Sequence, residues 1–89
     1  MFMTSTDWEF SDADAMTQAG HDMWPQIKSA GAISFKAAQT GDNTARTVII
    51  WPCAATAEAA IENLRAAAAS MTDTKVNGTA MGELTVDYE

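Results

Sequence analysis

The sequence Val-Ile-Ile-Trp at positions 48–51 decides the fold, because it is apolar at four successive positions. Neighbouring residues of a strand point to opposite faces of a sheet, so both faces of this strand need cover. Just upstream, Ile33, Phe35 and Ala37 alternate with other residues, and positions 40–44 (Thr-Gly-Asp-Asn-Thr) are typical of a turn. The two stretches are therefore predicted to form a β-hairpin.

One helix is predicted before this hairpin in the sequence and a second one after it. The first follows a strand over residues 2–10, is capped by Ser11, kinks or breaks after Trp24 because of Pro25, and ends at Gly31. The second is capped by Thr56. Apolar residues at helical spacing form one stripe on each helix: Met16, Ala19, Met23 and Ile27 on the first, and Ala57, Ile61, Leu64, Ala68 and Met71 on the second. Glu58, Glu62 and Arg65 are expected on the solvated side of the second helix.

The end of the chain is predicted to contain the last strand. Residues 72–82 are polar and include Asn77-Gly78, which indicates a loop, whereas Leu84, Val86 and Tyr88 alternate with polar residues. The resulting order is strand, helix, strand, strand, helix, strand. We therefore expect an α+β, ferredoxin-like βαββαβ fold, with a four-stranded antiparallel sheet and both helices on one face.

The second face of this sheet needs cover that the chain itself does not supply. Residues 49 and 51 cannot share a face with residues 48 and 50, so apolar side chains lie on both faces. We expect a second copy of the chain to cover the free face, giving a homodimer in which Ile49 or Trp51 meets the partner.

Composition limits the class of protein and its partners. Eighty-nine residues form one domain, residues 1–89, with a formal net charge of −7. The five basic residues are scattered, which argues against nucleic acid or an anionic membrane surface as partner. The single cysteine excludes an internal disulfide, and neither a signal peptide nor an apolar run of about 20 residues is found, so we expect a cytoplasmic protein.

Several of these features together resemble the dimeric α+β barrel superfamily, which includes the antibiotic-biosynthesis-monooxygenase-like (ABM-like) domains. They are the βαββαβ order, the length, the Trp24-Pro25 pair before Gly31, the Gly41-Asp42 turn, and the alanine-rich helix after residues 48–51. The resemblance implies sheet-to-sheet pairing of two copies and a ligand held between sheet and helices. It does not imply a reaction, because one fold serves many functions. Resemblance to the haem-degrading branch would imply a set of Asn, Trp and His residues with the histidine on the second helix. This chain has no histidine on its second predicted helix, which counts against haem degradation.

Few side chains are candidates for chemistry. His21 is the one group that titrates near neutral pH unaided, so it is the candidate acid or base, although an ordinary surface histidine on a helix fits the pattern too. Cys53 is more typical of a small buried apolar residue than of a nucleophile. Neither a metal site nor a dedicated cofactor is expected. Four aromatic residues either line a ligand pocket or form the core or dimer interface: Trp24, Phe35, Trp51 and Tyr88.

Three functions remain open from the sequence. The chain binds a small hydrophobic molecule between sheet and helices, or it is a cofactor-independent monooxygenase- or isomerase-like enzyme that uses His21, or it is a purely structural association module. The contents of any cavity beside His21 are expected to separate them.

Overall fold

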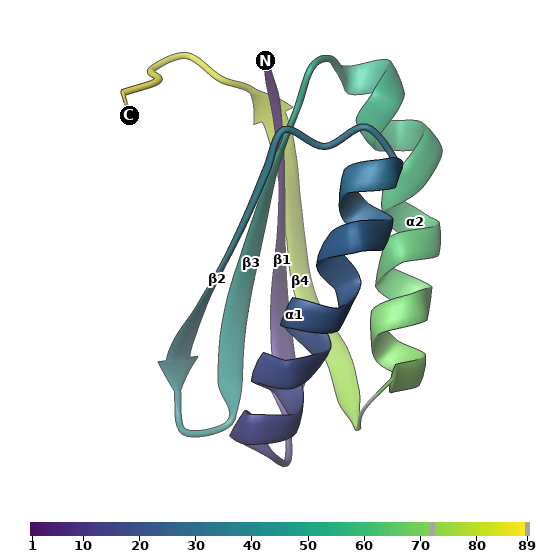
Figure 1. Ribbon diagram of the computed structural model, residues 1–89. Helices are drawn as coiled ribbons and strands as arrows, with labels where there is room; N and C mark the ends of the chain where they lie inside the picture. Colours follow the sequence, from purple (N-terminus) through teal and green to yellow (C-terminus); the bar gives the residue numbers. More distant parts are fainter. Residues whose placement is uncertain (72, 89) are drawn as a thin grey trace.

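The computed structural model describes residues 1–71 and 73–88, and its topology confirms the ferredoxin-like prediction. The strands form one antiparallel sheet in the order β2-β3-β1-β4, and both helices lie on the same face of it (Figure 1). In chain order the elements are β1 (Phe2–Phe10), α1 (Ala13–Ser29), β2 (Ser34–Gly41), β3 (Thr44–Trp51), α2 (Ala54–Met71) and β4 (Thr74–Glu83).

The register between the two central strands directs one set of side chains toward the helices. Phe2 lies opposite Trp51, and Trp8 lies opposite Ala45. These residues are buried, and Trp51 is fully so. The core forms where this face meets the helices: Phe2, Ile49 and Trp51 from the sheet pack with Met23 and Ile27 from α1 and with Ala57, Ile61 and Leu64 from α2.

The opposite face of the sheet carries the other half of the apolar strand and has no helix over it (Figure 1). Met3 lies opposite Ile50 and Ser5 opposite Val48. The apolar side chains of Met3, Val48 and Ile50 are only half-buried. The expectation that Ile49 or Trp51 meets a partner is therefore wrong, since both face the helices. Val48 and Ile50 occupy the open face instead.

The position of the last strand also differs from the prediction. β4 comprises residues 74–83, within the stretch expected to be a loop, whereas residues 84–88 form no strand. The polar β4 is stabilised by backbone pairing with β1, and the expected Asn77-Gly78 turn is instead a bulge at which the register shifts. Thr72, the first residue of the expected loop, lies outside the described residues.

Both helix starts differ from the predicted caps. Asp12, rather than Ser11, caps α1, because its Oδ1 accepts a hydrogen bond from the Ala15 amide at 3.1 Å. α2 begins at Ala54, two residues before the expected cap Thr56. The helix α1 also continues through Pro25, so the expected break after Trp24 is absent.

The end of α1 follows the prediction. Gly31 has a φ of 107°, a conformation that glycine adopts without steric cost after a helix. An added Cβ there would lie 2.8 Å from Thr56 Cγ2, so this glycine also permits the close approach of α2. Neither helix in residues 1–71 and 73–88 is long and apolar enough to cross a membrane.

A buried hydrogen bond in the core gives a direct test of this packing. The Trp51 indole N–H donates to Thr4 Oγ1 at 3.0 Å, with both residues almost fully buried. Thr4→Val keeps the side-chain shape but leaves the indole N–H unpaired, so we expect it to lower the free energy of unfolding by about 1–3 kcal/mol. Urea denaturation followed by tryptophan fluorescence, at fixed protein concentration, measures the loss.

The matched control for Thr4→Val removes an exposed hydroxyl. Thr40 donates to Thr44 at 3.0 Å on the surface of the hairpin, so Thr40→Val is expected to change stability by less than about 0.5 kcal/mol. Equal stability of Thr4→Val and the wild type would contradict the buried pairing.

Candidate functional site

Two adjoining hollows lie between the sheet and the helices. The outer groove, of about 590 Å3, is lined by α1, β2 and β3. The inner cavity, of about 50 Å3, is lined by both helices and the sheet. Four residues line both spaces, so the groove and the cavity adjoin at these side chains: Met16, Gly20, Phe35 and Thr47.

The outer groove contains three of the residues predicted from the sequence. His21 and Trp24 reach it from α1, and Phe35 reaches it from β2. They meet because residues 20, 21 and 24 lie on adjacent turns of one helix, above the face of β2 that carries Phe35. His21 is exposed at the mouth, whereas Phe35 is half-buried at the junction with the inner cavity.

Two other predicted site residues lie elsewhere. Trp51 is fully buried in the core, with its indole N–H bonded to Thr4, and it is not among the residues that line either space. Tyr88 is 91% exposed in the segment after β4, which extends away from the sheet (Figure 1). The structure therefore brings His21, Trp24 and Phe35 together and leaves Trp51 and Tyr88 apart from them.

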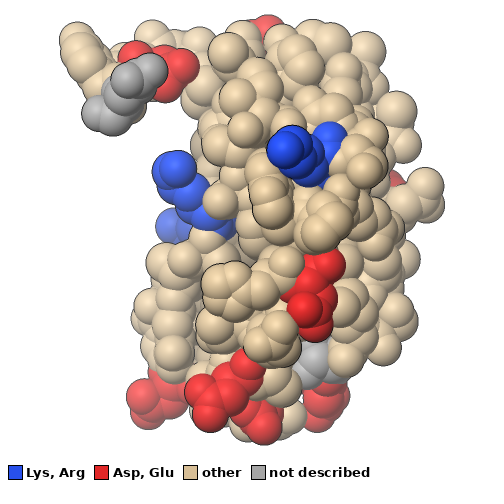
Figure 2. All heavy atoms as spheres, viewed as in Figure 1, with Lys and Arg blue, Asp and Glu red and all other residues tan. Residues whose placement is uncertain are grey.

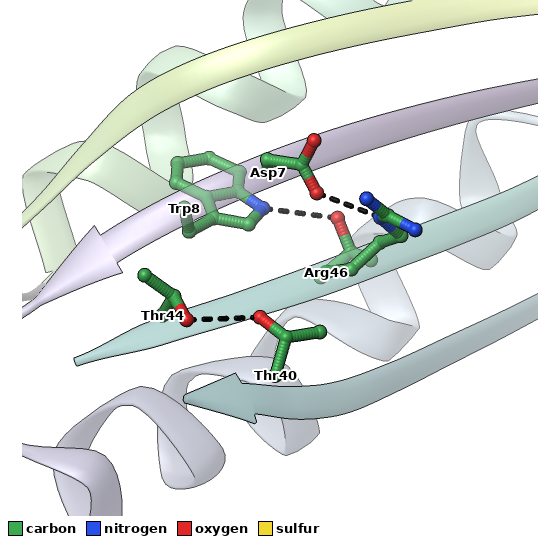
Figure 3. A network of polar contacts seen from close by, with 6 residues as sticks. Asp7, Trp8, Thr40, Thr44 and Arg46 are labelled. Carbon is green, nitrogen blue, oxygen red and sulfur yellow. Dashed lines mark hydrogen bonds and ion pairs between the residues drawn. The ribbon is translucent and has the colours of Figure 1, made fainter. Parts of the chain in front are cut away.

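The inner cavity is lined mainly by apolar side chains, and its polar lining residues include Arg65, Thr6 and Thr47. Arg65 is only 9% exposed, which corrects its expected place on the solvated side of α2. Its Nε donates to Thr6 Oγ1 at 3.0 Å, and its Nη1 lies 3.3 Å from Glu62 Oε1. The Trp8 indole N–H, also on β1, donates to Thr47 Oγ1 of the neighbouring strand β3 at 3.0 Å (Figure 3).

Sequence reasoning missed Arg65, although a signal for it was present. Ala57, Ile61 and Arg65 are spaced four residues apart, which places them along one side of α2. Arg65 is thus at the border of the apolar stripe, where a long side chain can lay its methylene groups over the sheet. A charged residue at this spacing was a reason to expect burial.

No group of three or more His, Cys, Asp or Glu side chains in residues 1–71 and 73–88 is arranged to hold a metal ion. The ionisable side chains beside the two spaces are His21 at the mouth and Arg65 at the inner end. An imidazole at the mouth can exchange a proton with a bound molecule, whereas a guanidinium stays charged and can only donate hydrogen bonds.

Cys53 lies outside this site, at the start of α2. Its side chain is exposed, so the expectation of a buried apolar cysteine is wrong. The Thr56 hydroxyl, 3.4 Å from Sγ, and then the Thr56 backbone amide stabilise the thiolate and lower the pKa of Cys53. The carbonyl of Cys53 also accepts a hydrogen bond from the Ala57 amide at the first turn of the helix.

Comparison with solved structures places the fold among known ones. A structural-genomics protein named YJCS superposes with a TM-score of 0.72 at 10% identity, over 94% of this chain and 98% of that one. A dimeric ferredoxin-like protein from an uncultured marine organism gives 0.67 at 11% identity, over 100% and 99%. A Deinococcus radiodurans protein, proposed to be an antibiotic biosynthesis monooxygenase, gives 0.64 at 7% identity, over 100% and 97%.

These likenesses confirm the predicted resemblance to ferredoxin-like, ABM-like proteins at the level of the fold. No protein-family model matches the chain, and no curated protein matches its sequence. Because a shared fold does not carry a shared activity, the function has to be argued from the groove and the cavity.

The environment of Cys53 predicts a pH dependence that can be measured. A lowered pKa means that the thiolate persists to lower pH, so the alkylation rate with iodoacetamide should reach half its maximum below the pH at which an ordinary cysteine does. Thr56→Val removes the hydroxyl and should move this midpoint upward, which slows alkylation at pH 7. Thr56→Ser keeps a hydroxyl and serves as the control. Identical midpoints for Thr56→Val and the wild type would show that the hydroxyl has no such effect.

Proposed function

We propose that this chain forms a homodimer through the open face of its sheet and binds a small hydrophobic molecule between the sheet and the helices. The observation that carries the binding proposal is the pair of adjoining spaces with mainly apolar linings. The groove volume of about 590 Å3 falls in the range of about 300–1,000 Å3 that small-molecule sites occupy. Trp24 and Phe35 offer aromatic surfaces to a ligand, and His21 and Thr47 offer a few polar groups.

The homodimer is supported by the apolar side chains on the open face. A contiguous patch across β1 and β3 is formed by Met3, Val48 and Ile50. Met3 pairs with Ile50, and Ser5, two residues further along β1, pairs with Val48. An ion pair borders the patch, with Arg46 Nε 2.7 Å from Asp7 Oδ1 (Figure 3). An apolar centre with a polar border is typical of protein interfaces. One structural neighbour is described as dimeric, and it spans the full length of this chain.

A second candidate function is an enzyme of the monooxygenase or isomerase type that needs no dedicated cofactor. The position of His21 at the mouth of the groove favours it, since the imidazole can accept or donate a proton beside a bound molecule. The Deinococcus radiodurans neighbour, proposed to be a monooxygenase, fits this alternative. Recovery of a bound compound unchanged after aerobic incubation would favour binding alone. A purely structural association module would leave the groove without any ligand.

Closing the junction between groove and cavity tests ligand binding. Gly20 lines both spaces, and an added Cβ there would lie 4.0 Å from Phe35 Cε2, so a leucine side chain would extend into the junction. Gly20→Leu is expected to weaken binding of the neutral fluorescent probe N-phenyl-1-naphthylamine by at least about tenfold. Gln18→Leu, at an exposed position of the same helix, should bind like the wild type. Equal affinities in all three proteins, or no binding by the wild type, would reject the proposed site.

A charge on the open face tests the homodimer. Ile50→Lys would bury an unpaired ammonium group in the proposed interface, and symmetry would bring in a second one, so the dimer dissociation constant should rise by about 100-fold or more. Sedimentation velocity over a concentration series measures it, and circular dichroism verifies folding. Ala59→Lys, exposed on α2, is the control and should leave association unchanged. A folded Ile50→Lys protein with wild-type association would contradict this interface.

A further inference from the structure

Arg65 has a nitrogen that is buried without a partner among the described residues, a feature that it shares with the hydroxyl of Thr74. Arg65 as a whole residue is 9% exposed, and its Nε and Nη1 bond to Thr6 and Glu62. No residue in the described part of the chain bonds to Nη2. A buried N–H of a charged group that lacks an acceptor is costly, so such a group is a place to look for a missing ligand.

Two threonine hydroxyls that line the inner cavity with Arg65 are able to donate hydrogen bonds. Thr6 and Thr47 are direct neighbours across β1 and β3, and both line the inner cavity beside Arg65. Their oxygens accept hydrogen bonds from Arg65 and Trp8, which leaves each hydroxyl proton free to be donated. Within residues 1–71 and 73–88, neither hydroxyl donates to a protein group. The polar side chains that line the cavity therefore include several groups able to donate to an acceptor-rich group.

The charges around the cavity favour an anion. The chain has twelve acidic residues and a net charge of −7, yet no acidic side chain among the described residues lines the groove or the cavity. In the helix-side view, acidic side chains gather instead toward the end of the molecule where α1 begins (Figure 2). Glu62, which partly neutralises Arg65, is 83% exposed, so its charge is screened by water.

The sizes of the two spaces set the shape of the ligand. A cavity of about 50 Å3 holds a group of a few atoms, whereas the groove of about 590 Å3 holds a larger body between α1 and β2. The small volume and the single unpaired nitrogen suit a planar, singly charged carboxylate better than a bulky, doubly charged phosphate.

We propose that the molecule bound at this site is an apolar monocarboxylate, whose carboxylate enters the inner cavity and accepts hydrogen bonds from Arg65. Its apolar body lies in the outer groove against Phe35 and Trp24. The inference rests on the proposed function, because it names the chemical class of ligand for the same site. It also gives Arg65 a role that packing alone does not require.

A matched pair of probes tests the inference. 1-Naphthoate and the neutral 1-naphthalenemethanol share one ring system and differ in the charge of one substituent. Isothermal titration calorimetry at pH 7 should show that the wild type binds the carboxylate at least about tenfold more tightly than the alcohol. Arg65→Met should remove this preference while changing the affinity for the alcohol by less than about threefold.

Two further variants keep the test decisive if Arg65→Met fails to fold. Glu62→Gln removes the partial counter-charge and should strengthen binding of 1-naphthoate, whereas Arg65→Lys keeps a charge but loses the planar donor group and should weaken it. Gln18→Leu is the control with unchanged preference.

The outcomes separate this inference from the proposed function. If both probes bind the wild type equally and the variants at positions 62 and 65 do not alter that ratio, the carboxylate inference is overturned while binding of an apolar molecule stands. If neither probe binds, and N-phenyl-1-naphthylamine does not bind either, the proposed function itself fails.

Discussion

The pairing of β1 with β3 at the centre of the sheet is the constraint on which the rest of the structure depends. Its register sends Phe2, Trp8 and Trp51 toward the helices and leaves Val48 and Ile50 on the open face. A shift by one residue would exchange the two faces, because side chains alternate along a strand. The same pairing therefore builds the core, forms the floor of the cavity and creates the apolar patch that we assign to a partner.

A row of threonines on the helix-facing side of these strands connects the core to the site. Thr4 and Thr47 each accept a hydrogen bond from a tryptophan indole, which satisfies the two indole N–H groups. Thr6, on β1 directly opposite Thr47, accepts from Arg65, whose remaining nitrogen is unpartnered in the described part of the chain. Going along the sheet, the polar groups change from closed pairs within the core to an open donor site at the cavity.

Strongly patterned parts of the sequence predicted their structure, and context decided the rest. Residues 48–51 predicted a strand with apolar side chains on both faces, and the structure places Ile49 and Trp51 under the helices and Val48 and Ile50 on the open face. β4 could not be recognised in the same way, because it is a polar edge strand that is held by backbone hydrogen bonds to β1. In the site, His21, Trp24 and Phe35 were found by residue type, whereas the importance of Arg65 depends on burial and on an unsatisfied nitrogen, which spacing only suggests.

The central claim is that one face of the sheet joins two copies while the other face, under the helices, holds a small apolar molecule. A native mass spectrum of the freshly purified protein tests it most directly, because it reports assembly and bound molecules together. The account predicts the mass of two chains carrying small-molecule adducts that disappear under denaturing conditions. A spectrum of bare single chains, at concentrations where the protein is folded, would contradict it.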